Sequence, residues 1–300
     1  MGKALSRIGS TLCGVGVTVI AGEKYIKHRQ LGEGAFSYVD EIENIKDGKF
    51  YALKRIICHD SKSEKEALDE AKATQSLSSK NIIKCRSFEV VKKSPYSEVW
   101  LVLEYFDKGT LWDHYQKLKG EGKTLKFNEI VRLFRGIVEG VNAIHEAGMV
   151  HRDLKPANIL LGEGNIPVIC DLGSLAEATV KISTKKEAQT LEDLASERCT
   201  LPYRAPELLA VPVGESITTA TDIWSVGCIL YSLVYLEGPF DSVWLKGDSV
   251  HLAVQSANFD TRRLDDVSGP LKALVEQMLD QDPKYRPPAD LVLRRLEEIG

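Results

Sequence analysis

The sequence predicts an α+β protein of two lobes, a smaller β-rich lobe followed by a larger, mostly helical lobe. Stretches rich in β-branched and aromatic residues dominate the chain up to about residue 105, and such stretches favour strands. After about residue 108, apolar residues recur at the three- and four-residue spacing of a buried helix face. A chain of 300 residues is also long enough for about two compact units.

The smaller lobe is expected to be a sheet with one inserted helix. Asp47-Gly48 is typical of a hairpin turn between two strands. Ser63 and Glu66 form an S-x-x-E capping box, which predicts that a helix over residues 63–77 begins at Ser63. The expected strands cover residues 17–21, 25–31, 38–43, 50–57, 87–92 and 98–105.

The larger lobe is expected to bury two helices. One is apolar on a single face, and the other, over residues 223–236, is apolar nearly all round, which is typical of a helix inside a domain. The periodic positions of the first are Ile130, Leu133, Phe134, Ile137, Val138, Val141 and Ile144.

Composition narrows the function classes before any motif is considered. The net charge of -4 and the pI of about 6.0 argue against a broad nucleic-acid surface, so no nucleic-acid partner is expected. The six cysteines include no C-x-x-C pair, which fits a reducing compartment better than a disulfide scaffold or a zinc site. No apolar run reaches the roughly 18 residues of a membrane span.

A glycine-rich segment lies in the first predicted hairpin. Gly32 and Gly34 would let the backbone approach a phosphate closely, although a Gly-x-Gly in a hairpin is more often just a turn. The third position of the G-x-G-x-x-G pattern is Ser37, and no helix follows, which disfavours a dinucleotide fold. Lys54, on a strand further on, suits a fixed cation for nucleotide phosphates, with Glu70 rather than Glu66 as its expected partner.

The most specific segment is His-Arg-Asp-Leu-Lys-Pro-Ala-Asn over residues 151–158, followed by Asp-Leu-Gly over residues 171–173. In order and spacing, these segments resemble the catalytic motifs of protein kinases. Three later segments fit the same pattern, namely residues 199–207, 222–225 and 282–287. The resemblance implies the bilobal protein-kinase fold, with one regulatory helix in a β-rich N-lobe and a mostly helical C-lobe. Lys155 before Pro156 is the serine/threonine pattern rather than the tyrosine-kinase one.

The resemblance implies roles for residues at the reacting phosphate. Asp153 would accept or orient the proton of the attacking hydroxyl, and Lys155 would stabilise the transferred γ-phosphate. Asn158 and Asp171 would bind Mg²⁺, with Mn²⁺ as an alternative. Thr200 would contact Asp153. Leucine at position 172 replaces the usual phenylalanine of D-F-G, a substitution found in active kinases.

The same resemblance implies an ATP site and one structural ion pair. Lys54, held by Glu70, would position the α- and β-phosphates. Glu207 and Arg286 would form a buried pair in the larger lobe. Adenine and the phosphates would contact Leu31, Gly32, Gly34, Ser37, Val39, Ala52 and Leu160, with backbone groups of Glu104 and Phe106 at the hinge and Leu103 as gatekeeper.

Five shorter stretches resemble the Numb-associated kinase family, and within it the small myristoylated and palmitoylated serine/threonine kinases of Golgi membranes. They cover residues 34–39, 109–112, 198–200, 237–240 and 246–250. That family carries an extra helix in its activation segment, which residues 187–198 would form here. The expected domains are a lipid-anchor segment at 1–17, an N-lobe at 18–106 and a C-lobe at 107–300, with the kinase domain proper over about 18–298.

The first residues fit the N-myristoylation pattern M-G-x-x-x-[ST], with Gly2 as the acceptor. Because one acyl chain binds membranes only marginally, a palmitoylated Cys13 is the expected second anchor. The expected location is the cytoplasmic face of intracellular membranes, Golgi first, with the plasma membrane as an alternative and some protein in the cytosol. The expected partners are protein substrates and, through the acyl chains, a membrane surface.

Two other functions stay open at this stage. A pseudokinase scaffold would keep the fold without turnover, and a kinase of small molecules or lipids would use the same two lobes. The intact Lys54, Asp153, Asn158 and Asp171 disfavour the first, and the segment 203–207, which shapes a protein-substrate platform in kinases, disfavours the second. The sequence does not indicate the physiological substrate or the oligomeric state.

Overall fold

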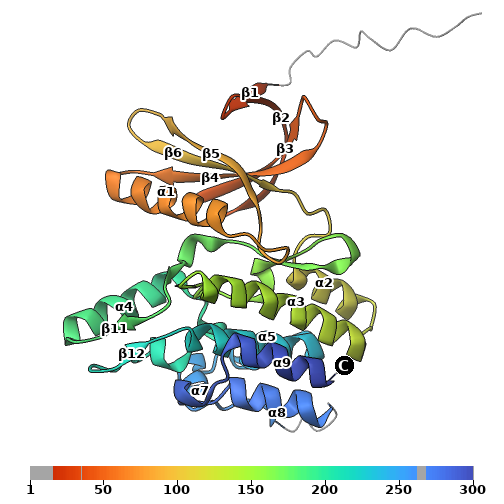
Figure 1. Cartoon of the computed structure of the whole chain (residues 1–300), viewed down its shortest axis with the longest axis vertical. Coiled ribbons are helices and arrows are strands. Elements are labelled where there is room, and N and C mark those ends of the chain that lie inside the picture. Colours follow the sequence, from red (N-terminus) through yellow and green to blue (C-terminus); the bar gives the residue numbers. More distant parts are fainter. Residues whose placement is uncertain (1–15, 35, 262–267, 300) are drawn as a thin grey trace, which may run out of the picture. The chain divides into compact units, whose positions relative to one another are not determined.

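The computed structural model describes residues 16–34, 36–261 and 268–299 (Figure 1). Gly2 and Cys13 lie outside these residues. The chain divides into two compact units: one comprises the described residues up to Gln75 together with Lys84–Tyr105, and the other comprises Ser76–Ile83 and the chain from Phe106 onward. The sequence-based division placed residues 76–83 in the first lobe, whereas the structure groups them with the second unit.

The first unit is a six-stranded antiparallel sheet with one helix beside it (Figure 1). Its strands run in the order β1-β2-β3-β4-β6-β5, and consecutive neighbours pair throughout. The helix is α1, Ser61–Ser76. The strands are β1 (Val17–Ile20), β2 (Glu23–Glu33), β3 (Ser37–Asn44), β4 (Phe50–Cys58), β5 (Cys85–Lys92) and β6 (Ser97–Glu104). All six predicted strands and the helix are therefore confirmed.

The core of this unit forms where apolar side chains from neighbouring strands meet. Tyr25 of β2 is fully buried, and its ring meets that of Tyr51 of β4 edge-on, with centroids 6.1 Å apart. Ile20, Ile42, Leu53 and Val102 complete the cluster. The hairpin between β3 and β4 turns at the predicted Asp47-Gly48, where Gly48 takes a φ of +67° that favours glycine.

The helix start predicted in this unit is wrong. Helix α1 begins at Ser61, because Asp60 rather than Ser63 caps it. The Asp60 carboxylate accepts the Ser63 N–H at 2.7 Å, and the Ser63 hydroxyl oxygen accepts the Asp60 N–H at 3.2 Å. Asp60 and Ser63 thus cap the helix reciprocally, in place of the predicted box of Ser63 and Glu66.

The second unit is mostly helical, with short strand pairs β7–β10, β8–β9 and β11–β12. Its helices are α2 (Leu111–Gly120), α3 (Phe127–Glu146), α4 (Lys185–Arg198), α5 (Ala220–Tyr235), α6 (Asp241–Lys246), α7 (Val250–Gln255), α8 (Gly269–Met278) and α9 (Ala289–Ile299). Its strands are β7 (Met149–Val150), β8 (Ile159–Leu161), β9 (Pro167–Ile169), β10 (Ala176–Glu177), β11 (Val180–Lys181) and β12 (Ser216–Ile217). The described residues of this unit also form the 3₁₀ turns η1 (Pro156–Asn158), η2 (Glu163–Asn165), η3 (Leu172–Ser174), η4 (Leu201–Tyr203), η5 (Pro206–Leu208) and η7 (Pro283–Tyr285).

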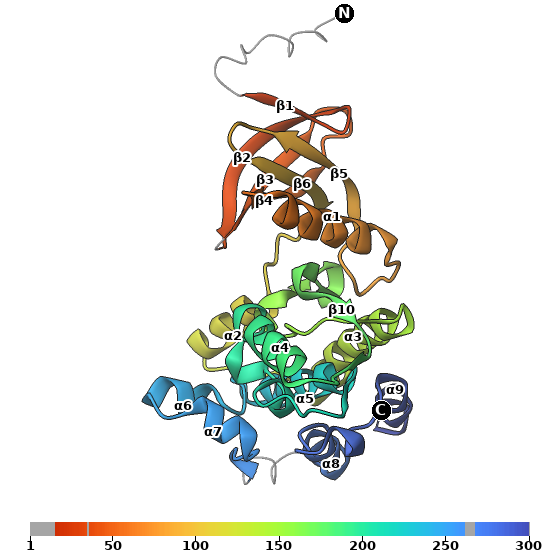
Figure 2. The same ribbon diagram turned by 90° about the vertical axis from the view of Figure 1, so that its left-hand side faces the viewer.

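Helices α3 and α5 form the centre of the second unit, as their apolar patterns predict. All seven periodic positions of α3 are buried, and Trp224, in α5, is fully buried and stacks on Phe240. Figure 2 shows α6 and α7 at one edge of this unit and α8 and α9 at another. None of the helices in the described part of the chain has both the length and the apolar character needed to cross a bilayer.

Helix α4 confirms the predicted helix near residues 187–198. Thr184 caps its start, because its hydroxyl accepts the Glu187 N–H at 3.2 Å and the Glu187 carboxylate accepts the Thr184 N–H. One face of α4 buries Leu191 and Ala195 in a small apolar cluster with Cys199 and Leu208. This packing fixes the segment that precedes Thr200.

Candidate active site

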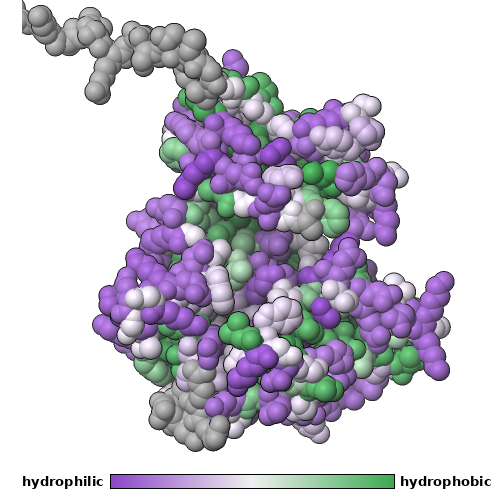
Figure 3. Space-filling view, turned by 180° about the vertical axis from the view of Figure 1, so that it is seen from behind, coloured by the Kyte–Doolittle hydropathy of each residue, from purple (hydrophilic) through white to green (hydrophobic). Residues whose placement is uncertain are grey.

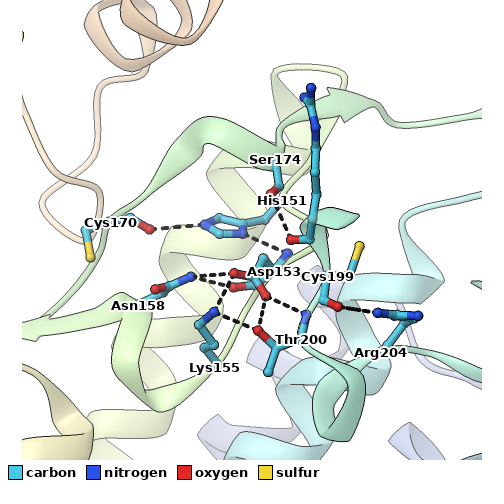
Figure 4. A network of polar contacts seen from close by, with 10 residues as sticks. His151, Asp153, Lys155, Asn158, Cys170, Ser174, Cys199, Thr200 and Arg204 are labelled. Atoms are coloured by element: carbon cyan, nitrogen blue, oxygen red, sulfur yellow. Dashed lines mark hydrogen bonds and ion pairs between the residues drawn. The ribbon is translucent and has the colours of Figure 1, made fainter. Parts of the chain in front are cut away.

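The carboxylate of Asp153 lies at the centre of a hydrogen-bond cluster on the loop between β7 and β8 (Figure 4). Oδ1 accepts the Thr200 N–H at 2.9 Å and the Thr200 hydroxyl at 2.7 Å. Oδ2 accepts Lys155 Nζ at 2.7 Å and Asn158 Nδ2 at 3.0 Å. Asp153 is only 7% exposed, so these donors hold one carboxylate orientation.

Lys155 and Thr200 also contact each other. Lys155 Nζ donates to Thr200 Oγ1 at 2.6 Å, so the threonine hydroxyl accepts from Lys155 while it donates to Asp153. The predicted contact between Thr200 and Asp153 is therefore confirmed. The Lys155 ammonium beside the Asp153 carboxylate can bind an anionic group that approaches this carboxylate.

The His151 ring makes two hydrogen bonds that help to hold this loop. Its Nδ1 accepts the Asp153 N–H at 3.2 Å, which leaves the proton of the neutral ring on Nε2. Nε2 then donates to the Cys170 carbonyl at 3.3 Å. Both ring nitrogens of His151 therefore take part in hydrogen bonds.

Asp222 holds the same loop from the first turn of α5, a role that sequence reasoning missed. Its Oδ2 accepts the His151 N–H and its Oδ1 accepts the Arg152 N–H, each at 2.8 Å. His145 Nε2 lies 2.9 Å from Oδ2. Burial alone would raise the pKa of Asp222, but the hydrogen bond and charge of His145 lower it overall. An acid that opens an otherwise apolar helix was the sequence signal for this role.

Asn158 and Asp171 supply oxygen atoms that fit a magnesium ion. Asn158 uses its amide nitrogen to bond the Asp153 carbonyl at 2.8 Å and the Asp153 carboxylate, which leaves its side-chain carbonyl oxygen for a cation. The Cys170 N–H donates to the Asn158 carbonyl at 2.9 Å, which places the exposed Asp171 directly after that contact. Amide and carboxylate oxygens are ligands that Mg²⁺ uses together with water and phosphate.

Clusters of three or more His, Cys, Asp or Glu side chains placed for a metal are absent from the described residues. A magnesium site does not need one, because Mg²⁺ is usually held by one or two carboxylates and by substrate phosphates. Cys170, which precedes Asp171, is half-buried. Burial raises the pKa of the Cys199 thiol to about 11, so this neighbour of Thr200 stays neutral at pH 7.

In the first unit, Lys54 of β4 pairs with Glu70 of α1. Lys54 Nζ donates to Glu70 Oε1 at 2.7 Å, and both side chains are largely buried. The expected pairing of Lys54 with Glu70 is confirmed. Glu66 faces Lys62 one turn away, with the charged atoms 3.8 Å apart.

The glycine-rich segment forms the end of the β2–β3 hairpin. Gly32 pairs with Val39, and the Gly34 N–H donates to the Ser37 carbonyl at 2.8 Å. A Cβ at Gly34 would lie 3.2 Å from the Ser37 hydroxyl, so Ser37 leaves little space there for a larger residue. Ala52 pairs with Leu103 between β4 and β6.

The residues predicted to bind the nucleotide and the metal are divided between the two units. The first unit contains Leu31, Gly32, Gly34, Ser37, Val39, Ala52, Lys54, Glu70 and Glu104, and the second contains Phe106, Asn158, Leu160 and Asp171. Within the second unit, Leu160 of β8 forms a bridge with Thr110.

The predicted buried ion pair between Glu207 and Arg286 is confirmed. Arg286 Nη1 and Nη2 donate to the two carboxylate oxygens of Glu207 at 2.7 and 2.9 Å. The Arg286 side chain is fully buried, and its guanidinium lies over the Trp224 ring. This pair fixes the end of the segment that carries Thr200.

Residues 25–295 match the family model of the protein kinase domain, and the chain belongs to the protein kinase family. The chain is 42% identical over 299 residues to serine/threonine-protein kinase 16 of Mus musculus, an alignment that covers 100% of this chain and 96% of the relative. The figures for the Homo sapiens protein of that name are the same. Serine/threonine-protein kinase ppk13 of Schizosaccharomyces pombe is 30% identical over 94% of this chain and 92% of its own length. The protein is a serine/threonine protein kinase.

Proposed function

We propose that the protein transfers the γ-phosphate of ATP to serine or threonine hydroxyls of other proteins, with Asp153 orienting the attacking hydroxyl. The convergence of Lys155, Asn158 and Thr200 on the Asp153 carboxylate carries this proposal. Phosphoryl transfer needs positioning and charge neutralisation more than covalent chemistry. The Asp153 carboxylate, held by four donors, would supply the positioning, and the adjacent Lys155 ammonium would supply the charge neutralisation.

The other residues divide the remaining work. Lys54, fixed by Glu70, would hold the α- and β-phosphates, and the glycine-rich hairpin would donate backbone N–H groups to them. Asn158 and Asp171 would hold Mg²⁺ or Mn²⁺. The bound metal would neutralise charge on the phosphate oxygens. Adenine would contact Leu31, Val39, Ala52 and Leu160 and the backbone of Glu104 and Phe106.

The test uses the full chain with Mg·ATP and a generic protein substrate. We expect phosphate transfer by the wild type, and a loss of about 10²–10⁴ in kcat for Asp153→Asn if this group takes the proton. Asp290→Asn, a change of an exposed acid on α9, is the matched control and should leave kcat unchanged. Nucleotide binding without any phosphate transfer would favour a pseudokinase scaffold. Phosphate transfer to lipids or small molecules alone would favour a kinase of those substrates.

We also propose that acyl chains on Gly2 and Cys13 tether the kinase to membranes. The sequence pattern at Gly2 supports the first chain, and the marginal membrane binding given by one myristoyl chain explains the need for the second. Five Lys or Arg against one acid in the first 30 residues add attraction to anionic lipid. Intact-mass measurement of protein from cells tests both chains, and Gly2→Ala should make the protein soluble. Unchanged membrane fractionation of Gly2→Ala would overturn the tether.

We place the protein in the Numb-associated branch of the kinases, acting at Golgi membranes in secretory trafficking or signalling. Helix α4 supports the branch, because that family carries an extra helix in the activation segment. Imaging of a protein tagged at its C-terminus tests the location. A signal confined to the plasma membrane, or spread evenly through the cytosol, would contradict it.

A further inference from the structure

A groove of about 470 Å³ in the second unit begins at the catalytic cluster. Lys155 and Thr200, which both contact the Asp153 carboxylate, are among the residues that line it. The rest is mostly apolar and includes Trp112, Pro156, Ala157, Leu201, Trp244 and Leu245. The groove therefore lies next to any polypeptide whose hydroxyl is held at Asp153.

The groove presents large apolar side chains to solvent. Trp244 is 61% exposed and Leu245 is 81% exposed, although both belong to the short helix α6. Trp112, at the start of α2, is 40% exposed. Hydrophobic patches interrupt the hydrophilic surface of the second unit in Figure 3. Neighbouring exposed apolar residues mark surfaces that bind a partner or ligand.

The acid in the lining does not offer a free charge to a basic substrate. Among the described residues that line the groove, Asp241 is the one carboxylate. Its Oδ2 accepts the Gly238 N–H at 2.6 Å, and the Tyr203 hydroxyl also bonds it. Burial raises the pKa of Asp241, which weakens its charge further. The groove therefore lacks the exposed acid that an Arg or Lys side chain would pair with.

We propose that this groove binds a large apolar side chain of the protein substrate, close in sequence to the phosphorylated Ser or Thr. The inference rests on the phosphate transfer to proteins proposed above. An extended peptide advances about 3.3–3.6 Å per residue, and the residues that line the groove include two that contact Asp153. The recognised side chain consequently lies within about four residues of the acceptor. Leu, Met, Phe and Trp are the residues it selects.

The experiment measures selection with the full chain, Mg·ATP and a positional peptide library around a fixed Ser or Thr. At one position within four residues of the acceptor, we expect Leu or Phe to exceed Gly by at least about tenfold in kcat/KM. Trp244→Ala/Leu245→Ala should reduce this preference to less than about threefold while leaving kcat with the Gly peptide unchanged. Leu245→Glu should instead favour Lys or Arg at that position, a gain that misfolding cannot produce.

Leu252→Ala is the matched control, because Leu252 is 64% exposed on α7 and does not line the groove. It should retain the wild-type preference. Phosphate transfer without apolar selection, or selection unchanged in the double variant, would overturn this inference alone. Loss of self-association in the double variant with unaltered selection would assign the groove to a second copy of the chain and also overturn it. Absence of transfer to every peptide would overturn the proposed function as well.

Discussion

Replacing Arg286 by leucine tests the buried ion pair that closes the segment around the active site. Arg286 donates both terminal nitrogens to Glu207. It also donates to the backbone carbonyls of Asp280 at 2.8 Å, Ala220 at 2.9 Å and Gln281 at 3.3 Å. In Arg286→Leu, the Glu207 carboxylate stays buried without its cation, and these carbonyls lose a charged donor.

The structure sets the size of the expected effect. Removing one partner of a buried pair costs about 3–5 kcal/mol, because the remaining charge is left uncompensated. A protein is usually stable by only about 5–15 kcal/mol, so Arg286→Leu should remove a large part of the free energy of unfolding. Glu207→Gln should cost less, since Arg286 keeps its carbonyl partners. The two changes should be coupled by about 2 kcal/mol.

Urea unfolding followed by tryptophan fluorescence and far-UV circular dichroism measures these free energies. Arg294→Leu is the matched control, because Arg294 pairs with Asp290 at 2.9 Å on the exposed face of α9. Such an exposed pair should contribute only about 0.3–0.5 kcal/mol. A cost below about 1 kcal/mol for Arg286→Leu, or additive effects of the two changes at the buried pair, would refute the reasoning.

Three further variants test the site and its support. Thr200→Val keeps the hydrogen bond from the backbone N–H to Asp153 but loses the one from the hydroxyl, so kcat should fall about 10–150-fold. Thr200→Ser should restore the activity. A kcat of Thr200→Val within twofold of the wild type in steady-state kinetics would contradict this expectation. Lys54→Met should lower kcat/KM for ATP by about 10²–10³-fold, and an equal loss in Lys62→Met, an exposed lysine, would rule out a specific role for the Lys54–Glu70 pair. The pKa of Asp222 is lowered below its ordinary value of 3.8, so its stabilising contribution is complete above that pH and is lost as the pH falls below it. The Tm difference between wild type and Asp222→Asn should therefore shrink in that acidic range, and a difference that stayed constant would count against it.

Local sequence patterns predicted the elements and the reacting residues well. Period and composition were sufficient for the six strands, for α3 with its single buried face and for α5, which is buried nearly all round. Short motifs of fixed spacing placed Asp153 and Asn158 on one loop. The contact of Thr200 with Asp153 came from the family resemblance rather than from spacing, since the two residues lie far apart in the chain.

Features that depend on competition between nearby side chains were predicted less well. Both Asp60 and Ser63 can cap a helix, and the sequence alone does not show which one the preceding strand places at the helix end. The role of Asp222 depends on the loop from residue 151 lying against α5, a contact between distant segments. Residues 76–83 begin at the last residue of α1, and nothing in their composition shows that they pack in the second unit.

The placement of residues 76–83 in the second unit affects how the protein folds during its synthesis. The Ile83 N–H donates to the Ile169 carbonyl, the Ile169 N–H donates to the Asn81 carbonyl, and the Asn81 side chain donates to the Pro167 carbonyl. Ile82, which is almost fully buried, joins the core of the second unit. During synthesis from the N-terminus, the whole first unit emerges before β9 exists. The first unit therefore emerges from the ribosome together with the inserted residues 76–83. These residues lack their hydrogen-bond partners in β9 until more than half of the chain has been made.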